Sequence, residues 1–375
     1  MNQFIPVNTP LLSGGNEKKY LNECIDSGWI SSEGSFVSKF EEEFALSVGR
    51  DYAVAVSNGS CALDASIIAL EIGKGDEVIM PTFTIISCAS AITRAGATPV
   101  YVDCDQYTFN IDVDLIEPLI TKNTKAIMVV HIYGLPCDMD PILSLAKKYN
   151  LKIIEDAAEV HGQTYKNKKC GSFGDVSTFS FYPNKHITTG EGGMIVTDSK
   201  EIAEKTRKLR NLYFEPPQRF VHNELGFNLR MTNIQAALGV AQLEKLNHHV
   251  SLKRKIGNLY NKSLKDIENI QIPISHTDYS ENIYWVYTIV LSKSIGKNAK
   301  QVMNELGKKE IGTRPFFYPM HKQPILKKLG YERNANNCPV SEEIAEYGFY
   351  LPSGLGITEE EILHVSDVLK GVLND

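Results

Sequence analysis

The sequence predicts an α/β protein in which a mostly parallel β-sheet is covered by helices on both faces. Between residues 52 and 156, short apolar runs rich in Val and Ile alternate with segments of helical periodicity. Each apolar run is strand-sized and is followed by small or polar residues. This alternation is typical of βα units, whose strands are buried on both faces of the sheet. We expect a smaller α+β unit in the last third of the chain.

The elements of the larger unit are expected in a regular order. Two helices come first, over residues 16–27 and 35–48. The predicted strands that follow are 52–56, 77–80, 98–102, 125–131 and 151–155. The predicted helices between and after them end at Leu70 and Ala95 or span 114–120, 138–149, 200–212 and 232–246.

In the C-terminal third, the sequence predicts helices at 253–267 and 299–306 and strands at 284–291 and 313–317. The polar stretch 248–255 is expected to open a long helix that joins the two units. The last helix starts at the capping box Thr358-Glu359-Glu360-Glu361. Because 375 residues exceed what one core usually fills, we divide the chain into a large domain, 1–247, and a small C-terminal domain, 248–375.

Composition excludes several classes of protein. The chain is 43% apolar and 22% charged, with a net charge of −6 and no basic block, so nucleic acid and anionic membranes are not expected partners. Seven scattered cysteines without a C-x-x-C pair indicate reduced thiols in a cytoplasmic protein and no metal site. Residues 1–12 lack the features of a signal peptide, and no apolar run has the length of a membrane span.

Polar residues follow the predicted strands at the edge where ligands bind in such sheets. Ser57-Asn58-Gly59-Ser60 stands between a strand and a helix, where backbone N–H groups can approach an anion. The alternative for this segment is an ordinary cap and turn. Phe83, His131 and Asp156 are expected along the same edge.

Lys185 lies at the bend between an alternating run, 177–182, and a second apolar strand, 194–197. The alternative is an exposed lysine in a surface hairpin. A primary amine can hold an aldehyde cofactor as a Schiff base, and a carboxylate such as Asp156 can keep a pyridine nitrogen protonated. Phe83 is a candidate to stack on such a ring, although most Phe side chains simply fill a core.

Other catalytic patterns are missing. The glycines of 190–193 do not follow G-x-G-x-x-G spacing, and there is no G-x-S-x-G segment. His248 and His249 do not have the spacing of a helical metal pair, and we expect them on a solvated face.

Several segments in one order resemble the DegT/DnrJ/EryC1/StrS family of pyridoxal-phosphate-dependent nucleotide-sugar aminotransferases. The matching segments are 28–32, 57–60, 75–79, 155–162, 180–185, 189–193 and 228–235. The resemblance covers nearly the whole chain. It implies the type I aminotransferase fold, pyridoxal 5'-phosphate as cofactor, L-glutamate as amino donor, a keto nucleotide sugar as acceptor, and a homodimer with shared active sites.

The resemblance also implies roles for individual residues. Lys185 holds the cofactor and moves protons, and Asp156 pairs with the pyridine nitrogen. Phe83 takes the ring-stacking place, and Glu159 stands where many relatives have Gln beside the phenolic oxygen. The implied phosphate ligands are Gly59, Ser60, Ser180 and, from the neighbouring subunit, Asn228. The implied substrate contacts are Trp29, Ser31, His186, Arg314, Phe316 and His321.

Glu159 and segments 129–140 and 184–194 resemble the subgroup that acts on GDP-4-keto-6-deoxy-D-mannose. This resemblance implies amination at C4 for surface polysaccharide, the O-antigen. UDP- or dTDP-linked 4-keto or 3-keto sugars are alternatives. A 3-dehydratase of the same fold would have histidine in place of Lys185, and a non-catalytic regulator would carry a fused DNA-binding module; the sequence supports neither.

Overall fold

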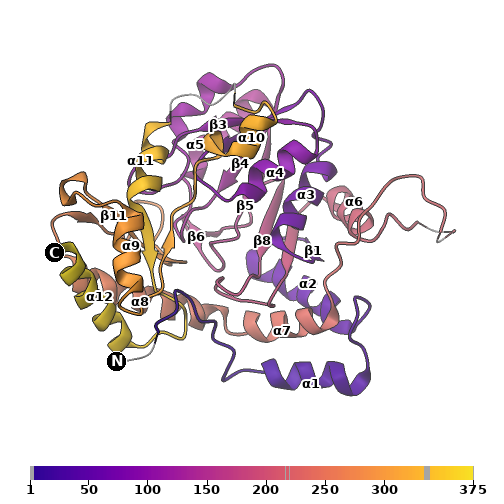
Figure 1. The fold of residues 1–375 in the computed structure, drawn as a ribbon. Coiled ribbons are helices and arrows are strands. Elements are labelled where there is room, and N and C mark those ends of the chain that lie inside the picture. The colour runs from indigo at the N-terminus through magenta and orange to yellow at the C-terminus, as the bar shows by residue number, and fades with distance from the viewer. Residues whose placement is uncertain (1–3, 216, 219, 333–337, 375) are drawn as a thin grey trace.

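The chain folds into two units, each built on its own sheet. The computed structural model describes residues 4–215, 217–218, 220–332 and 338–374. Within these ranges the larger sheet has seven strands in the order β1-β9-β8-β5-β4-β2-β3, and the smaller has four in the order β10-β11-β13-β12. Figure 1 shows the smaller unit, in orange and yellow, beside the larger sheet.

The larger sheet is mostly parallel, as predicted. Its strands are β1 (Tyr52–Val56), β2 (Glu77–Pro81), β3 (Thr98–Val102), β4 (Thr124–Val130), β5 (Lys152–Asp156), β8 (Val176–Ser180) and β9 (Gly193–Thr197). β9 pairs antiparallel with both β1 and β8, whereas the other pairs are parallel. The carboxyl ends of β4, β5, β8 and β1 therefore meet at one edge.

Helices cover both faces of this sheet because side chains alternate along each strand. On β1, Val54 and Val56 pack toward α3 (Gly59–Ala69), α4 (Ile86–Arg94) and α6 (Lys200–Arg210). Ala53 and Ala55 belong to a second apolar cluster with α2 (Ser35–Val48) and α7 (Asn233–Leu243), and α5 (Met139–Tyr149) covers β4 and β5 on that side. The helix α1 (Glu17–Ser27) packs on α7.

The smaller unit is an antiparallel sheet with helices. Its strands are β10 (Ile270–Gln271), β11 (Tyr287–Leu291), β12 (Arg314–Pro315) and β13 (Gly348–Leu351). One apolar cluster joins this sheet to α8 (Leu246–Leu264), α9 (Ala299–Gly307) and α12 (Glu359–Asn374). Shorter helices, α10 (Pro324–Lys328) and α11 (Pro339–Tyr347), and the hairpin of β6 (Thr164–Tyr165) and β7 (Lys168–Lys169) complete the described chain.

The N-terminal segment crosses between the units. Ile5 forms a bridge with Ile311, and the Ser353 N–H donates to the Val7 carbonyl. Residues 5–7 therefore lie against the C-terminal unit. Figure 1 shows this unit beside the larger sheet. The division at residues 247 and 248 stays a prediction.

Four sequence expectations need correction. Residues 114–120 form two short 3₁₀ turns, Val113–Leu115 and Glu117–Leu119, because Pro118 cannot continue a helix. The strand expected at 313–317 is limited to β12. The helix expected at 253–267 is part of α8, which begins at Leu246 and ends at Leu264. His249 does not face solvent: it is buried in α8.

No helix in the described part of the chain is long and apolar enough to span a membrane.

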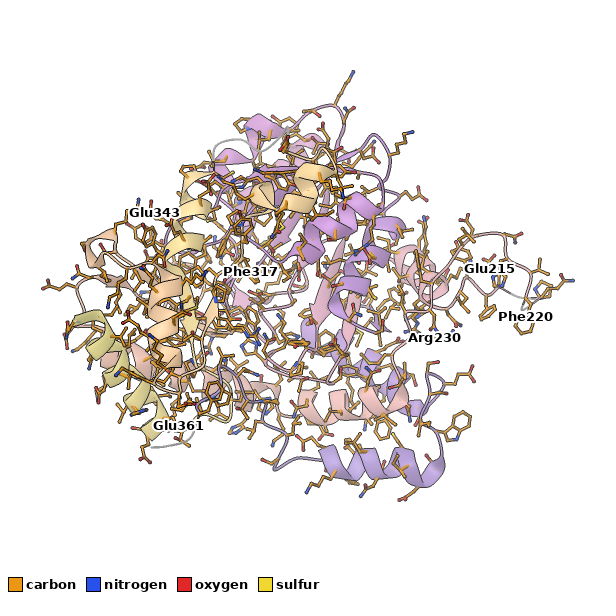
Figure 2. All side chains as sticks on the ribbon, in the orientation of Figure 1. Glu215, Phe220, Arg230, Phe317, Glu343 and Glu361 are labelled. Carbon is orange, nitrogen blue, oxygen red and sulfur yellow. The ribbon has the colours of Figure 1, made fainter. Side chains whose placement is uncertain are left out.

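The segment between α6 and α7 forms an extended loop. Figure 2 shows Glu215 and Phe220 on this loop, at a distance from the rest of the molecule. Phe220, Leu225 and Phe227 are exposed on it.

Candidate active site

The loop after β8 presents Lys185. The Lys185 N–H donates to the Tyr182 carbonyl at 2.9 Å, which closes a turn with Pro183 at its second position, where proline is favoured. β8 and β9 pair from Ser177 to Ser180, so the loop starts and ends on a rigid ladder. The predicted strand-loop-strand is confirmed, and the Lys185 side chain is only 10% exposed instead of lying in solvent on a hairpin.

A cavity of about 750 Å³ opens beside Lys185. It lies at the carboxyl ends of β4, β5 and β8, as the α/β rule predicts. The cavity brings together seven residues that were expected in the site from the sequence: Gly59, Ser60, Asp156, Glu159, Ser180, Lys185 and Arg314. Phe317, which Figure 2 places between the two units, contributes to the wall from the C-terminal side.

Two acids lie close to the Lys185 amine. The Nζ atom is 3.9 Å from Glu159 Oε1, and Glu159 Oε2 accepts from the Tyr133 N–H at 2.8 Å. Burial lowers the pKa of Lys185, although Glu159 and Asp156 oppose that shift. Burial raises the pKa of Glu159 to about 8, opposed by Lys185. Burial therefore favours the neutral form of both groups.

Asp156 ends β5 and is buried with one oxygen held by its own turn. The Ala158 N–H donates to Oδ1 at 3.1 Å, and the Cys88 thiol donates to Oδ2 at 3.4 Å. Burial raises the pKa of Asp156, against the hydrogen bond from Ala158 and the charge of Lys185. A cation placed against this carboxylate would reverse the shift, because opposite charges favour the ionised form.

The start of α3 has donors available for an anion. Asn58 Oδ1 accepts from the Cys61 N–H at 2.9 Å, and the Ala62 N–H donates to the Asn58 carbonyl. No described residue accepts from the N–H groups of Gly59 and Ser60 in this structure. Ser60 Oγ lies 2.7 Å from Ser87 Oγ, so two hydroxyls stand at the same place.

Gly59 permits a close approach at this point. A Cβ added to Gly59 would lie 2.8 Å from the Ser180 Cβ. The absence of a side chain therefore lets the α3 N-terminus and the end of β8 stand together. Free N–H groups, hydroxyls and a helix N-terminus form an anion site of the kind that binds phosphate.

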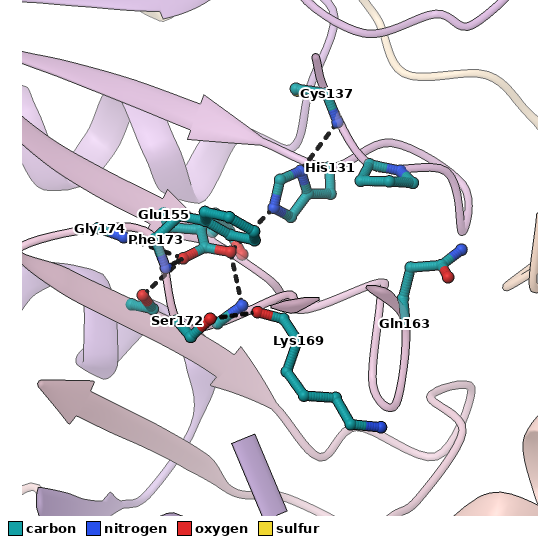
Figure 3. Close-up of polar contacts among 12 residues, drawn as sticks. His131, Cys137, Glu155, Gln163, Lys169, Ser172, Phe173 and Gly174 are labelled. Carbon is teal, nitrogen blue, oxygen red and sulfur yellow. Dashed lines mark hydrogen bonds and ion pairs between the residues drawn. The ribbon is translucent and has the colours of Figure 1, made fainter. Parts of the chain in front are cut away.

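Behind Asp156, the neighbouring Glu155 supports the sheet edge (Figure 3). Its two oxygens accept from His131 Nε2 at 3.0 Å, from the Ser177 hydroxyl at 2.8 Å and from three backbone N–H groups. Those three belong to Gly171, Phe173 and Gly174. Burial alone would raise the pKa of Glu155, but the His131 bond and charge together with these donors lower it to about 2.

The ring-stacking place assigned to Phe83 is not supported by the structure. Phe83 is fully buried and does not line the cavity; its ring packs against Phe109, Tyr133, Phe316 and Phe317. Ile85, two residues later and 42% exposed, lines the cavity instead. Phe83 was favoured by its aromatic type and its place in the loop after a strand, and neither feature distinguishes which side chain of that loop faces the cavity.

Three expected substrate contacts are also buried away from the cavity. Phe316 belongs to the aromatic cluster of Phe83, and His186 packs beside His161. His321 lies 2.6 Å from the Thr82 hydroxyl and 3.0 Å from Glu342 Oε1. None of the three is a cavity-lining residue, so the substrate contacts assigned to them are not supported by the structure.

Trp29, Ser31 and Asn228 lie outside the cavity of their own chain. Trp29 is 56% exposed, and Ser31 lines a separate hollow with Arg207, Arg210 and Arg230. Asn228 is exposed at the base of the loop between α6 and α7. Sequence reasoning missed Ser87, Trp285 and Tyr350, which do line the cavity. Nothing in their local sequence pattern distinguishes them from core residues.

Comparison with known proteins agrees with this geometry. A family profile described as the DegT/DnrJ/EryC1/StrS aminotransferase family matches residues 13–370. The chain belongs to this aminotransferase family. The lysine, the strand-end aspartate and the anion cradle thus line the cavity of an aminotransferase chain.

Individual relatives match over almost their full length. The chain is 44% identical to GDP-perosamine synthase of Caulobacter vibrioides over 98% of both chains, and 42% identical to GDP-perosamine synthase of Escherichia coli O157:H7 over 100% of both. Among solved structures, this aminotransferase chain is similar to DesV of S. venezuelae, determined in complex with a ketimine intermediate. The TM-score is 0.88 at 31% identity, covering 96% of this chain and 95% of DesV.

Proposed function

We propose that this protein is a pyridoxal-5'-phosphate-dependent aminotransferase that transfers an amino group from L-glutamate to C4 of GDP-4-keto-6-deoxy-D-mannose. The product would be GDP-perosamine, a precursor of O-antigen. The observation that carries the proposal is the largely covered Lys185 amine beside two carboxylates, facing an anion cradle across one cavity. The full-length similarity to two GDP-perosamine synthases supports the sugar and the nucleotide.

The residues present fit this cofactor. The N–H groups of Gly59 and Ser60 with the Ser180 and Ser60 hydroxyls would hold the phosphate, and the close Gly59–Ser180 approach leaves no room for a Cβ there. Asp156 would face the pyridine nitrogen, and Lys185 would hold the aldehyde carbon. When bound, the cofactor supplies an electron sink for the carbon that loses its proton.

Lys185 is the proton-moving group in this proposal. Burial lowers its pKa, which favours the neutral amine that can accept a proton. Glu159 lies on one side of Nζ, and the Trp285 ring lies on another side. The centroid of that ring is 3.8 Å from Nζ. These neighbours restrict where the amine can point and exclude water from it. General acid–base catalysis of this kind contributes about 10²–10⁴-fold.

A panel of keto nucleotide sugars tests the substrate. Purified protein is incubated with L-glutamate and GDP-, UDP- or dTDP-linked 4-keto and 3-keto sugars, and products are identified by mass. We expect amination of the GDP-linked 4-keto sugar only. If only UDP- or dTDP-linked sugars react, the proposed GDP-linked substrate is wrong. In Lys185→Ala, turnover should be abolished, and retained steady-state activity would refute the role of Lys185.

We further propose a cytoplasmic homodimer in which Asn228 completes the neighbouring site. Its exposure at the base of the loop between α6 and α7 and its place outside the cavity lining support a contribution in trans. The test mixes Lys185→Ala and Asn228→Ala subunits, each inactive or impaired alone. A hybrid dimer should regain one intact site and activity. Unchanged low activity in verified hybrids would place Asn228 in its own chain's site.

A further inference from the structure

Trp285 reaches from the C-terminal unit to the lysine loop of the larger unit. Its ring centroid is 3.8 Å from Lys185 Nζ, and its indole Nε1–H donates to the Asn184 carbonyl at 2.7 Å. The side chain is 4% exposed and lines the cavity. One residue thus contacts both the lysine amine and the backbone immediately before it.

The position of Trp285 is set by the loop after β4. The Ile283 N–H donates to the Gly134 carbonyl at 3.3 Å. A Cβ added to Gly134 would lie 2.6 Å from the backbone nitrogen of Trp285. The Trp285 ring also stacks on Tyr133, with centroids 6.0 Å apart. Since the Tyr133 N–H holds Glu159, the same loop directs Glu159 and Trp285 to Lys185 from two sides.

Other contacts hold the lysine loop without touching its amine. Asn8 Nδ2 donates to the Pro183 carbonyl at 3.0 Å, and His249 Nδ1 lies 2.8 Å from the His186 carbonyl. The backbone is therefore fixed on both sides of Lys185. These backbone contacts do not orient the Lys185 amine, so its orientation depends on other contacts.

The charge around the amine comes from several elements. Glu159 and Asp156 both favour the ammonium form of Lys185, and His161 and His186 are buried beside the same loop. An aromatic face attracts an ammonium group through its quadrupole, most strongly for Trp and when water is excluded. The Trp285 ring adds such a stabilising face without adding a charge.

We propose that Trp285 is a positioning residue that orients the Lys185 amine and stabilises its ammonium form. The C-terminal unit thereby acts on proton transfer at a lysine of the other unit. The consequence for turnover rests on the function proposed above, whereas the effect on Lys185 itself does not.

The test compares Trp285→Phe, which keeps an aromatic face but loses the Nε1–H donor, with Trp285→Leu, which loses both. In the full chain without cofactor, the pH dependence of Lys185 labelling by an amine-selective reagent is mapped by mass spectrometry. We expect Trp285→Leu to move the labelling midpoint down by about one pH unit and Trp285→Phe to move it much less. Labelling of the exposed Lys122 in the same sample is the control.

Turnover gives the second readout. Trp285→Phe should lower kcat about tenfold with a smaller change in KM, because one hydrogen bond to the loop is lost while the cavity keeps its shape. A wild-type labelling profile in Trp285→Leu would overturn the proposal. If the labelling shifts but no sugar is aminated by any variant or the parent protein, the function fails and the Trp285 contact stands.

A measurement without substitution at Trp285 covers the case in which the Leu variant does not fold. The chain has two tryptophans, so Trp29→Phe leaves Trp285 as the sole indole emitter. Its emission should change with pH through the Lys185 titration, and the change should disappear in Trp29→Phe/Lys185→Met. An unchanged pH response after removal of Lys185 would also overturn the proposal.

Discussion

Lys185 Nζ and Glu159 Oε1 lie 3.9 Å apart, with their side chains 10% and 7% exposed, so the protonation of each group affects the other. We predict that Glu159→Gln lowers the pKa of Lys185 further, because a charge that favours the ammonium form is removed while the amide oxygen can still accept from Tyr133. The pH midpoint for capture of pyridoxal 5'-phosphate by the cofactor-free chain should move down. Absorbance stopped-flow measures it.

The matched control is Glu191→Gln, since Glu191 also lines the cavity but is exposed. Its midpoint should equal that of the parent chain. An upward shift in Glu159→Gln, or equal shifts in both variants, would contradict direct coupling of Glu159 to Lys185.

Gly134→Ala should impair the site from outside the cavity. Gly134 has φ of +102°, and a Cβ there would lie within 2.8 Å of the backbone nitrogens of both Tyr284 and Trp285. We expect a loss of about 1–3 kcal/mol of stability from the backbone conformation alone, plus displacement of Trp285 and a lower kcat. Thermal unfolding and steady-state kinetics measure the two effects.

Gly75→Ala is the control that distinguishes the effect of backbone strain from that of a steric clash with neighbouring atoms. Gly75 has a similar φ of +95°, but no atom lies within 4 Å of an added Cβ. It should lose comparable stability and keep its kcat. If Gly134→Ala also keeps its kcat, the close approach does not position Trp285.

Lys253→Met should stabilise the protein in a pH-dependent way. Lys253 is buried in α8 and donates to the Ser353 carbonyl, and burial lowers its pKa to about 7. Below pH 7 the folded chain bears the full cost of a buried ammonium; this cost falls as pH rises from 7 toward 10.5, where the unfolded lysine also loses its proton. The advantage of Lys253→Met should therefore be greatest near pH 6.5.

Differences in thermal unfolding between Lys253→Met and the parent, recorded at pH 6.5 and 9.5, test this point. We expect the difference to shrink by an amount on the order of a few kcal/mol at the higher pH. A difference that does not vary with pH would show that Lys253 is not desolvated as its burial indicates.

Glu155→Gln should destabilise the chain without contacting the cavity. The carboxylate accepts five hydrogen bonds, and an amide would turn its NH₂ group toward N–H donors. We expect a loss of roughly 3–5 kcal/mol, as for other buried charges whose partners are left unpaired. Exposed Glu268→Gln makes the same chemical change and should be neutral.

The pH dependence of this loss has a defined sign. Because the pKa of Glu155 is lowered to about 2 in the folded chain, its contribution is present above the unfolded value of 4.5 and is lost as pH falls through about 2. The gap between Glu155→Gln and the parent should close between pH 4.5 and 2. Chemical denaturation across that range measures it, and a gap that widens on acidification would contradict the assignment.

Local sequence predicted the larger unit well because its signals act over short range. The strands from Tyr52 to Asp156 are apolar and bounded by small or polar residues, and parallel pairing buries both of their faces. Asp156 and Gly59 could be placed at one edge because strand ends in such a sheet converge there, whereas Ser180 joined them through the family resemblance. The helix predicted at 114–120 does not form, because Pro118 interrupts it despite the apolar residues at helical spacing around it.

By itself, then, the sequence determined the α/β class, the family, and the lysine and aspartate at the strand ends. Tertiary structure alone decided which distant side chains surround them. Phe83 and Ile85 are two residues apart, and only packing against Tyr133 and Phe317 directs the ring away from the cavity. Trp285 stands 100 residues from Lys185, and its contact depends on the close approach at Gly134, which no local periodicity encodes.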